Sequence, residues 1–354
     1  MTNSQDISFT EALKVWLRIG LLSFGGPAGQ IALMHRTLVD ERKWLTEDEF
    51  LPALNFCMLL PGPEAMQLAT YAGWRLHGVK GGLAAGLLFV IPGALVVLVL
   101  SIIYALFGQV PLITALFFGV KAAVLAIVIE ALLRISKRAL KRPADWWIAA
   151  AAFIALFAFN LPFPLVVITA GLIGFWLAHE TVLTETAMAD KPINTTAAPS
   201  QPVPWRATCK TIALWLIIWL APVAAIAWLI YPDHVLVTTG LFFSKLAVVT
   251  FGGAYAVLAY MGQQAVETHQ WLSAAEMIDG LGLAETTPGP LILVTEFVGF
   301  LAGFRASGLL GSISGGLAAA TMTLWVTFAP CFLWIFAGAP YIERLQSMPR
   351  LSSA

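Results

Sequence analysis

The chain has 354 residues, of which 59% are hydrophobic and only 11% are charged, and its 20 basic residues balance 20 acidic ones. Soluble domains carry about a quarter charged residues, so this composition excludes a soluble enzyme, a secreted disulfide scaffold and a disordered chain. The balanced charge also excludes nucleic acid as a partner, because that binding depends on clustered Lys and Arg. We therefore expect an all-α polytopic membrane protein whose surroundings are the lipid bilayer.

The first predicted element is an apolar segment over residues 12–34, and the residues before it lack the basic region and cleavage site of a signal peptide. This segment is interrupted by Phe24-Gly25-Gly26-Pro27, and the next one, residues 50–76, is interrupted by Pro61-Gly62-Pro63. Proline removes a backbone donor and glycine permits conformations that other residues avoid, so helices should break at both motifs. A broken backbone at membrane depth persists only where protein buries it or where it lines a wet cavity.

Later segments complete the expected membrane part. Four apolar runs reach the roughly 20 residues that cross a bilayer as a helix, namely 81–107, 110–133, 207–231 and 308–338. A basic cluster at 134–142 indicates a cytoplasmic loop, and a hairpin over 146–178 follows it. Residues 179–206 are rich in Thr, Ala and Pro, which is typical of a solvated cytoplasmic linker. The sequence thus predicts an N-terminal half with an extra hairpin (1–178), the linker (179–206) and a C-terminal half (207–354).

The two halves repeat one another at an offset of 227 residues. That shift relates Phe24-Gly25-Gly26 to Phe251-Gly252-Gly253, Trp44-Leu45 to Trp271-Leu272, and Pro61-Gly62-Pro63 to Pro288-Gly289-Pro290. Two glycine/proline signatures at one offset indicate a duplication. The loop at 35–49 holds Arg36, Arg42 and Lys43, whereas its equivalent at 262–276 holds no Lys or Arg, which predicts halves of inverted topology. Arg305 is the one basic residue that this topology places on the wrong side.

The four breaks are the predicted anion site. A break frees amide N–H groups at a helix N-terminus, whose partial positive charge suits an oxyanion, and the alternative is that the breaks are turns or kinks that serve packing. The candidate substrate-binding residues are the motif residues with nearby polar and cationic side chains: Arg18, Phe24, Gly25, Gly26, Pro61, Gly62, Pro63, Glu64, Gln67, Tyr71, Lys245, Phe251, Gly252, Gly253, Pro288, Gly289 and Pro290. Arg18 and Lys245 are related by the same offset, and they either flank an anion path or extend to the membrane interface. Lys121, in the middle of a predicted helix, is a further candidate anion contact.

A polar stripe follows the first PGP motif, because Glu64, Gln67, Tyr71 and Arg75 share one face of a helix. Glu64 is either a proton-coupling carboxylate or a first-turn acid that complements the helix dipole. At the offset of 227, four apolar residues replace the stripe in the second half: Leu291, Val294, Val298 and Ala302. The second half places two acids near its break instead, Glu285 and Glu296. The halves are therefore not expected to be functionally equal.

No cofactor, metal ion or catalytic group is expected. The five histidines fall in predicted loops without metal-ligand spacing, and no Walker lysine follows a glycine loop, so energy should come from ion or voltage gradients. An intramembrane enzyme for a lipid substrate would need paired acids, a Ser/Lys or Asp/Asp pair, or a His cluster, and a passive channel would need a charged ring. Neither pattern is present in the sequence, which favours a transporter over an enzyme.

The sequence resembles the chromate ion transporter (ChrA) family. The resemblance rests on LLSFGGPAGQIALMHR (21–36), the Trp44-Leu45 loop, LLPGPEAMQLATYAGWRLHG (59–78), and the second-half segments TFGGAYAVLAYM and TTPGP. It implies a bacterial inner (plasma) membrane protein of two homologous, oppositely oriented halves that exports chromate, with site positions at the FGG and PGP motifs of both halves. The second FGG is followed by Ala254 where the first has Pro27, and the second PGP by Leu291 where the first has Glu64. These departures argue against a symmetric division of labour.

The residues themselves do not select the substrate. Chromate is a tetrahedral dianion of nearly the size and charge of sulfate, and helix ends with a fixed cation would bind either. Chromate export is implied by the resemblance alone, and sulfate or another oxyanion, moved in either direction, is the alternative. A homodimer is one assembly that the sequence leaves open.

Overall fold

A computed structural model shows a chain of helices, with no β-strand among the residues that it describes. Those residues are 7–24, 26–108, 110–112, 115–119, 143–159, 205–250, 254–306 and 312–346, with single residues and pairs between 126 and 173. They fall into two compact units, one within residues 1–124 and 200–354 and the other within 125–199. The predicted helix at 110–133 is described only in part, and Lys121 and residues 179–204 of the predicted linker lie outside the described residues.

The first half of the larger unit contains both predicted breaks. Helix α1 (Phe9–Leu22) ends before the FGG motif, and α2 (Gly26–His35) begins within it. A π-helical turn, η2 (Arg36–Glu41), leads to α3 (Glu47–Leu59), which ends before the PGP motif, and α4 (Glu64–Phe107) begins after it. Glycine is required at both breaks, because Gly26 has φ +70° and Gly62 has φ +110°. In the first half, helices therefore end and begin at both motifs.

Helix α4 turns back on itself at His77 and Gly78. The backbone leaves helical geometry there, and Gly78 has φ +60°. The parts before and after this point, residues 64–77 and 79–107, pack so closely that a Cβ at Gly73 would lie 2.3 Å from the carbonyl oxygen of Gly81. The ion pair between Glu49, at the start of α3, and Arg75, near the end of the first part of α4, shows that this segment returns to the side on which it enters.

The second half repeats this order of elements. It comprises α8 (Trp205–Leu229), α9 (Val235–Val249), α10 (Ala254–Gln263), η3 (Gln264–Thr268), α11 (Ala274–Thr286), η4 (Leu291–Leu293), α12 (Val294–Arg305) and α13 (Ser312–Gln346). Local details repeat as well, because capping boxes begin α3 and α11, and a π-helical turn precedes each of them. Helices α9 to α13 are thus the equivalents of α1 to α4.

The constant offset of 227 is wrong beyond the second PGP motif. The 3₁₀ turn η4 inserts three residues there. The equivalence is visible at Gly303, where a Cβ would lie 2.2 Å from the Gly315 carbonyl oxygen, the same arrangement as at Gly73. The true equivalents of the polar stripe are therefore four other residues: Val294, Phe297, Leu301 and Arg305. The predicted misfit, Arg305, is the counterpart of Arg75.

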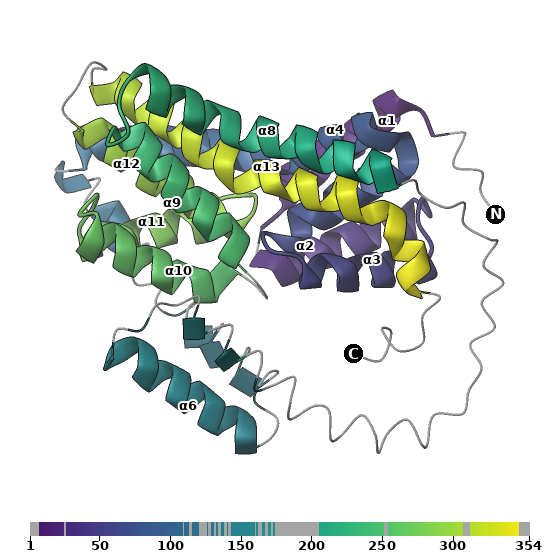
Figure 1. Cartoon of the computed structure of the whole chain (residues 1–354), viewed down its shortest axis with the longest axis horizontal. Helices are drawn as coiled ribbons and strands as arrows, with labels where there is room; N and C mark the ends of the chain where they lie inside the picture. Colours follow the sequence, from purple (N-terminus) through teal and green to yellow (C-terminus); the bar gives the residue numbers. More distant parts are fainter. Residues whose placement is uncertain are drawn as a thin grey trace. The chain divides into compact units, whose positions relative to one another are not determined.

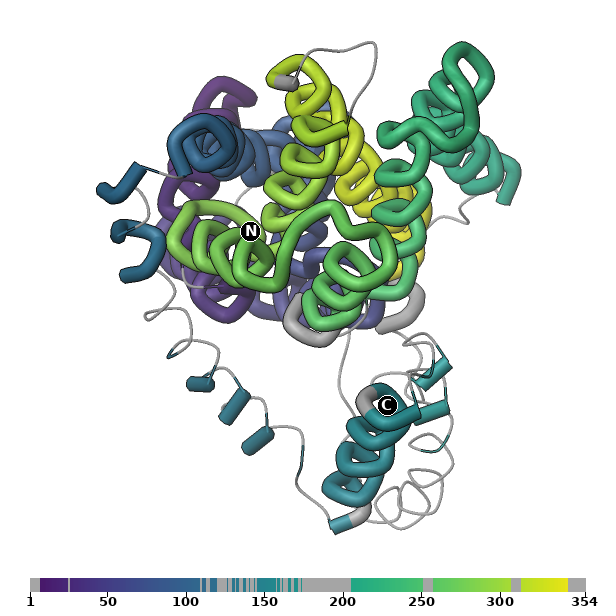
Figure 2. The backbone as a smooth tube through the Cα atoms, turned by 90° about the vertical axis from the view of Figure 1, so that its left-hand side faces the viewer, coloured from purple at the N-terminus to yellow at the C-terminus, as the bar shows by residue number. Residues whose placement is uncertain are grey.

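The repeats have opposite orientations. The second part of α4 and helix α13 are equivalent elements, yet Gly82 lies against Phe336 and Gly86 against Phe332, so the two helices run antiparallel. Within the larger unit, α2 and α3 lie at one end and α10 and α11 at the other, with α13 running from one end to the other (Figure 1). Seen from the second-half end, the green helices of that half stand in front of the purple helices of the first (Figure 2). The predicted inverted duplication is therefore confirmed.

Three described helices are long and apolar enough to cross a membrane, over Glu64–Phe107, Trp205–Leu229 and Ile313–Ile342. Much of α8 shows apolar side chains at its surface, including Leu214, Ile217 and Trp228, which suits contact with lipid. Helix α12 is the opposite case, because every residue from Val294 to Gly303 is buried. In the smaller unit, α6 (Pro143–Phe157) is the longest described helix.

Candidate functional site

The breaks of the two halves lie against each other. The Gly62 N–H of the first PGP donates to the Thr250 carbonyl oxygen at 2.7 Å, and the Gly289 N–H of the second PGP donates to the Ser23 carbonyl oxygen at 2.8 Å. Ser23 and Thr250 each end the helix before an FGG motif, and the two bonds are related by the repeat. We call this place, defined by Ser23, Gly62, Thr250 and Gly289, the break crossing.

Two glutamines of the first half hold the PGP carbonyl groups. Gln30 Nε2 donates to the Gly289 carbonyl oxygen at 2.6 Å, and Gln67 Nε2 donates to the Pro61 carbonyl oxygen at 2.7 Å. Both side chains are buried, and Gln67 Oε1 has no hydrogen-bond partner among the described residues. Gln67 was a predicted site residue, whereas Gln30 was not, because nothing in its own segment shows that it reaches the other half.

Two hydroxyl groups complete the ends of the preceding helices. Ser23 Oγ donates to the Ile19 carbonyl oxygen at 2.6 Å, and Thr250 Oγ1 donates to the Leu246 carbonyl oxygen, also at 2.6 Å. These bonds satisfy carbonyl groups that the helix end leaves unpaired. A hydroxyl residue directly before each FGG motif was the sequence signal for this detail.

Four helical segments begin at the break crossing, namely α2, α4, α10 and the η4–α12 pair. Pro63 and Pro290 stand at the N-cap positions of α4 and η4, and neither offers a side-chain acceptor to the first-turn amides. An uncapped helix N-terminus carries a partial positive charge that favours an anion. The described residues therefore bring the N-terminal ends of α4 and of the η4–α12 pair to the buried glycines of the break crossing, whereas α2 begins at the partly exposed Gly26.

Carboxyl groups stand near the same place. Glu64 begins α4 and is partly buried, Glu285 lies at the end of α11, and Glu296 lies in the first turn of α12 with 1% of its surface exposed. An ionised carboxylate here would repel a bound anion and compete with it for the helix dipole.

The predicted cations lie elsewhere. Arg18 is exposed on the face of α1 that carries Leu17 and Leu21 and is opposite the buried face. Lys245 is also exposed, and its Nζ lies 5.9 Å from the centre of the Tyr260 ring. Neither side chain is buried at the break crossing, so their predicted role in binding rests on the sequence pattern alone.

The other predicted residues have mixed positions. Tyr71 is buried in α4, while half of the Phe24 side chain is exposed. Arg75, the end of the polar stripe, lies at the surface and pairs with Glu49 at 3.1 Å. Gly25 and Phe251-Gly252-Gly253 lie outside the described residues.

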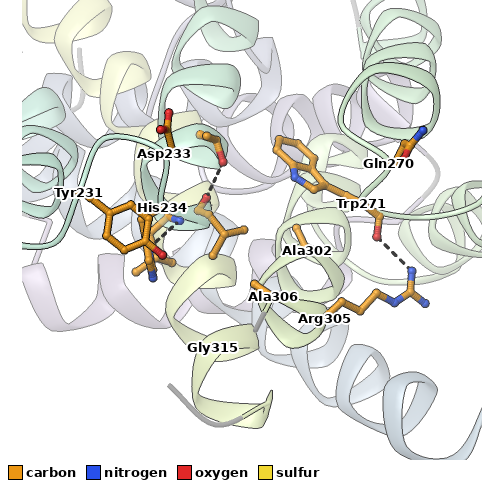
Figure 3. A pocket seen from close by; sticks show the side chains of 13 residues that line it. Tyr231, Asp233, His234, Gln270, Trp271, Ala302, Arg305, Ala306 and Gly315 are labelled. Carbon is orange, nitrogen blue, oxygen red and sulfur yellow. Dashed lines mark hydrogen bonds between the residues drawn. The ribbon is translucent and has the colours of Figure 1, made fainter. Parts of the chain in front are cut away.

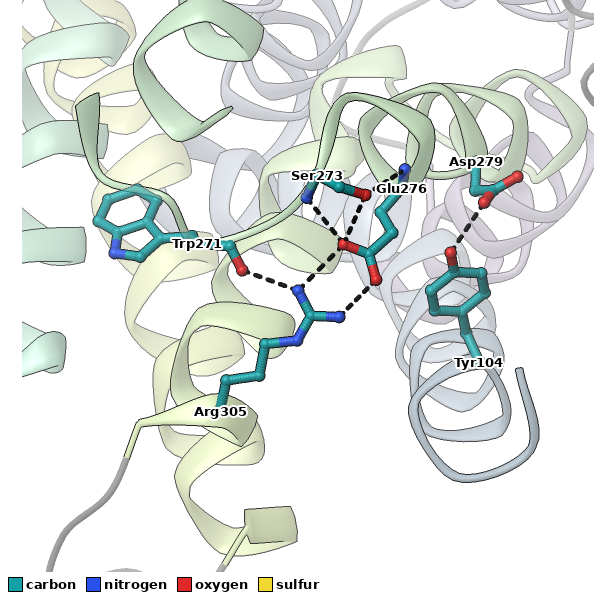
Figure 4. Close-up of polar contacts among 6 residues, drawn as sticks. All are labelled: Tyr104, Trp271, Ser273, Glu276, Asp279 and Arg305. Carbon is teal, nitrogen blue, oxygen red and sulfur yellow. Dashed lines mark hydrogen bonds and ion pairs between the residues drawn. The ribbon is translucent and has the colours of Figure 1, made fainter. Parts of the chain in front are cut away.

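An ion pair closes each re-entrant segment. Glu49 at the start of α3 pairs with Arg75, and Glu276 at the start of α11 pairs with Arg305, which also donates to the Trp271 carbonyl oxygen at 3.0 Å (Figure 4). Partial burial alone would raise the pKa of Glu276, but hydrogen bonds from Arg305 and Ser273 outweigh it and lower the pKa to about 2. Sequence reasoning missed these pairs because their partners are far apart in the chain.

A hydrogen bond also links the halves at the second-half end. The Tyr104 hydroxyl, late in α4, donates to Asp279 Oδ2 of α11 at 2.8 Å (Figure 4). Because α4 and α11 belong to different halves, a movement of the halves that separates these two helices would stretch this bond.

A cavity of about 380 Å³ lies at this end, at the opposite end of α12 from the break (Figure 3). Its lining includes Asp233 and His234 before α9, Gln270 and Trp271 before α11, and Arg305. The negative charge of Asp233 and the positive charge of Arg305 offset each other, so the cavity has no excess of positive charge that would concentrate an anion.

The fold and the site define the class of protein. A helical membrane protein of two inverted repeats, with helices broken where the repeats meet, has the architecture of a secondary transporter. A family model described as chromate transporter matches residues 10–175 and 237–354. The chain belongs to the chromate transporter family.

Relatives of known name agree with this family. The chain is 28% identical over 338 residues to a chromate transport protein of Cupriavidus metallidurans. The aligned region covers 95% of this chain and 75% of the relative. It is 32% identical over 353 residues to a chromate transport protein of Pseudomonas aeruginosa. This aligned region covers 97% of this chain and 74% of the relative. No solved structure matches the chain.

Proposed function

We propose that this transporter exports chromate across the bacterial inner membrane and binds the dianion at the break crossing. The observation that carries the proposal is that hydrogen bonds from Gly62 to Thr250 and from Gly289 to Ser23 hold each PGP motif against the FGG end of the opposite half. Because these two N–H groups are already bonded, the anion is left to the first-turn amides that follow them. Each helix N-terminus is equivalent to about +0.5 elementary charge, so the ends that follow the two PGP motifs supply about +1 towards the dianion. The family membership supports chromate as the oxyanion.

The inverted repeats suggest how the site opens. Rocking of one half against the other about the break crossing would expose it to each side of the membrane in turn. An interior-negative membrane potential favours the exit of a dianion by about 4.6 kcal/mol per 100 mV, since each charge contributes about 2.3 kcal/mol. Export therefore requires no bound nucleotide.

The test is chromate movement by purified protein in proteoliposomes, with the potential set by a potassium gradient and valinomycin. We expect labelled chromate to enter vesicles whose interior is positive, and everted membrane vesicles to accumulate it, as export requires. Unlabelled sulfate in excess measures how well the site separates the two dianions.

A matched pair of variants tests the place of binding. Gln30→Glu puts a negative charge beside the Gly289 carbonyl group and should lower chromate transport at least tenfold. Gln270→Glu makes the same change at an exposed loop position and should leave transport near the wild-type rate. Equal rates in both variants would remove the break crossing as the site.

Sulfate or another oxyanion is the second candidate substrate. The proposed donors favour this alternative, because backbone amides and helix dipoles recognise the charge and tetrahedral shape of an oxyanion but do not distinguish its central atom. Transport of sulfate at the chromate rate, with full mutual competition, would establish it.

A further inference from the structure

Glu296 is a buried acid for which the family membership and the helix dipoles give no role. It lies in the first turn of α12, directly after the second break, and 1% of its surface is exposed. Its Oε2 atom is buried and has no hydrogen-bond partner among the described residues. A buried charge without a partner costs several kcal/mol, so this side chain is stable only when it holds a proton.

No described cation is placed to neutralise Glu296. The elements that pack against α12 are α4, α9, α11, α13 and η4. Their described titratable side chains are Glu64, Tyr71, Arg75, His77, Lys80 and Tyr104 on α4, Lys245 on α9, Glu276, Asp279 and Glu285 on α11, and Cys331 and Tyr341 on α13. Arg75 pairs with Glu49, Lys245 lies over Tyr260, and Lys80 is exposed.

The remaining neighbours of α12 are also engaged or acidic. Tyr104, whose ring centre lies 5.2 Å from that of Phe297, donates to Asp279, and Glu276 pairs with Arg305. The residue that occupies the equivalent position in the first half is Met66, which is fully buried in α4. The fold therefore accepts an apolar side chain at this position of the repeat, and packing alone does not require an acid there.

We propose that Glu296 carries one proton together with the oxyanion in each transport cycle. The proposal rests on the proposed binding of the anion at the break crossing. Ionised Glu296 in the first turn of α12 occupies the dipole end that the anion needs, and protonation of its carboxylate oxygen leaves that end free. The proton comes from water on the side where the anion enters and is released to water on the side where the anion leaves. The moving complex then carries one net negative charge instead of two, so the membrane potential contributes half of what it would contribute for the dianion alone.

The reversal potential of chromate flux in proteoliposomes tests this coupling. A tenfold proton gradient corresponds to about 59 mV for one charge, so in the wild-type protein one pH unit should shift the reversal potential by about that amount. Glu296→Met and Glu296→Gln should abolish the shift, and Glu267→Gln, an exposed acid of the same half, should retain it. If the reversal potential of both Glu296 variants still shifts by the full amount, the proposal is overturned. It is also overturned if the reversal potential of the wild-type protein does not change with pH.

A second measurement separates this proposal from the proposed function. Infrared difference spectra of the wild-type protein in lipid should contain the carbonyl band of a protonated carboxyl group at neutral pH, and this band should be lost in Glu296→Gln. A spectrum without that band overturns the proposal even if chromate is transported. If the band is present but no chromate moves, the proposed substrate is wrong and Glu296 still holds its proton.

Discussion

Alanine at Gly62 is expected to damage both the stability and the transport activity of the protein. Gly62 has φ +110°, and an added Cβ would lie 3.0 Å from Cys331 Sγ and 3.0 Å from Gln67 Nε2. A left-handed backbone costs a residue with a side chain about 1–2 kcal/mol. Displacing Gln67 also weakens its bond to the Pro61 carbonyl group, which is worth about 0.5–1.5 kcal/mol. The total is about 1.5–3.5 kcal/mol.

Two other glycines separate these contributions. Gly78 has φ +60° with nothing within 4 Å of an added Cβ, so Gly78→Ala should show only the backbone cost. Gly119 also has open space around it and no positive φ, so Gly119→Ala should be close to neutral. The three variants should therefore rank Gly62, Gly78, Gly119 in decreasing loss of stability.

The assay is thermal unfolding in detergent, followed by chromate transport in proteoliposomes. Gly62→Ala should lower Tm by several degrees and transport by tenfold or more, whereas Gly78→Ala should lower Tm with a smaller effect on transport. If Gly62→Ala has the same Tm and the same transport rate as the wild-type protein, the reasoning is refuted, because the break then tolerates a side chain.

Three further predictions concern the second-half end. The pKa of Glu276 is lowered to about 2, so its ion pair stabilises the fold above the ordinary glutamate pKa of 4.5, and this stability is lost as pH falls towards 2. When Tm is measured from pH 5 to 2, it should therefore fall less in Glu276→Gln than in the wild-type protein. Arg305→Lys keeps the charge but lacks the planar guanidinium whose two nitrogens each donate to one carboxylate oxygen, so it should lower Tm at neutral pH. An unchanged Tm would show that the pair contributes little. Tyr104→Phe removes the hydrogen bond to Asp279 and should cost about 0.5–1.5 kcal/mol, read from the denaturant midpoint. If that bond also holds the halves together at this end, Tyr104→Phe should speed transport, and a slower rate would contradict this role.

The family fold constrains how far symmetry explains function. Both halves contribute a PGP amide and a hydroxyl-capped helix end to the break crossing, and these are related by the duplication. The glutamines come only from the first half, and the buried, unpartnered acid comes only from the second. The geometry of the site is therefore symmetric, while its polar chemistry is divided between the halves.

Much of the fold could be predicted because membrane proteins obey local rules. Apolar length predicted the long helices, and the glycine and proline motifs predicted the breaks, since both effects act within a few residues of the backbone. The asymmetry of Lys and Arg in the loops predicted the inversion. The insertion of η4 was missed because an apolar three-residue turn has no pattern of its own in an apolar segment.

The sequence by itself determined the class of protein, the duplication and the four interruptions, because composition, repetition and backbone propensity are all local properties of the chain. Only the tertiary structure decided that each PGP motif bonds to the helix end of the opposite half, that Gln30 reaches Gly289, and that Arg305 is the counterpart of Arg75. These contacts join residues more than a hundred positions apart or depend on a local insertion. They are set by how two inverted halves pack, which the order of residues in either half does not contain.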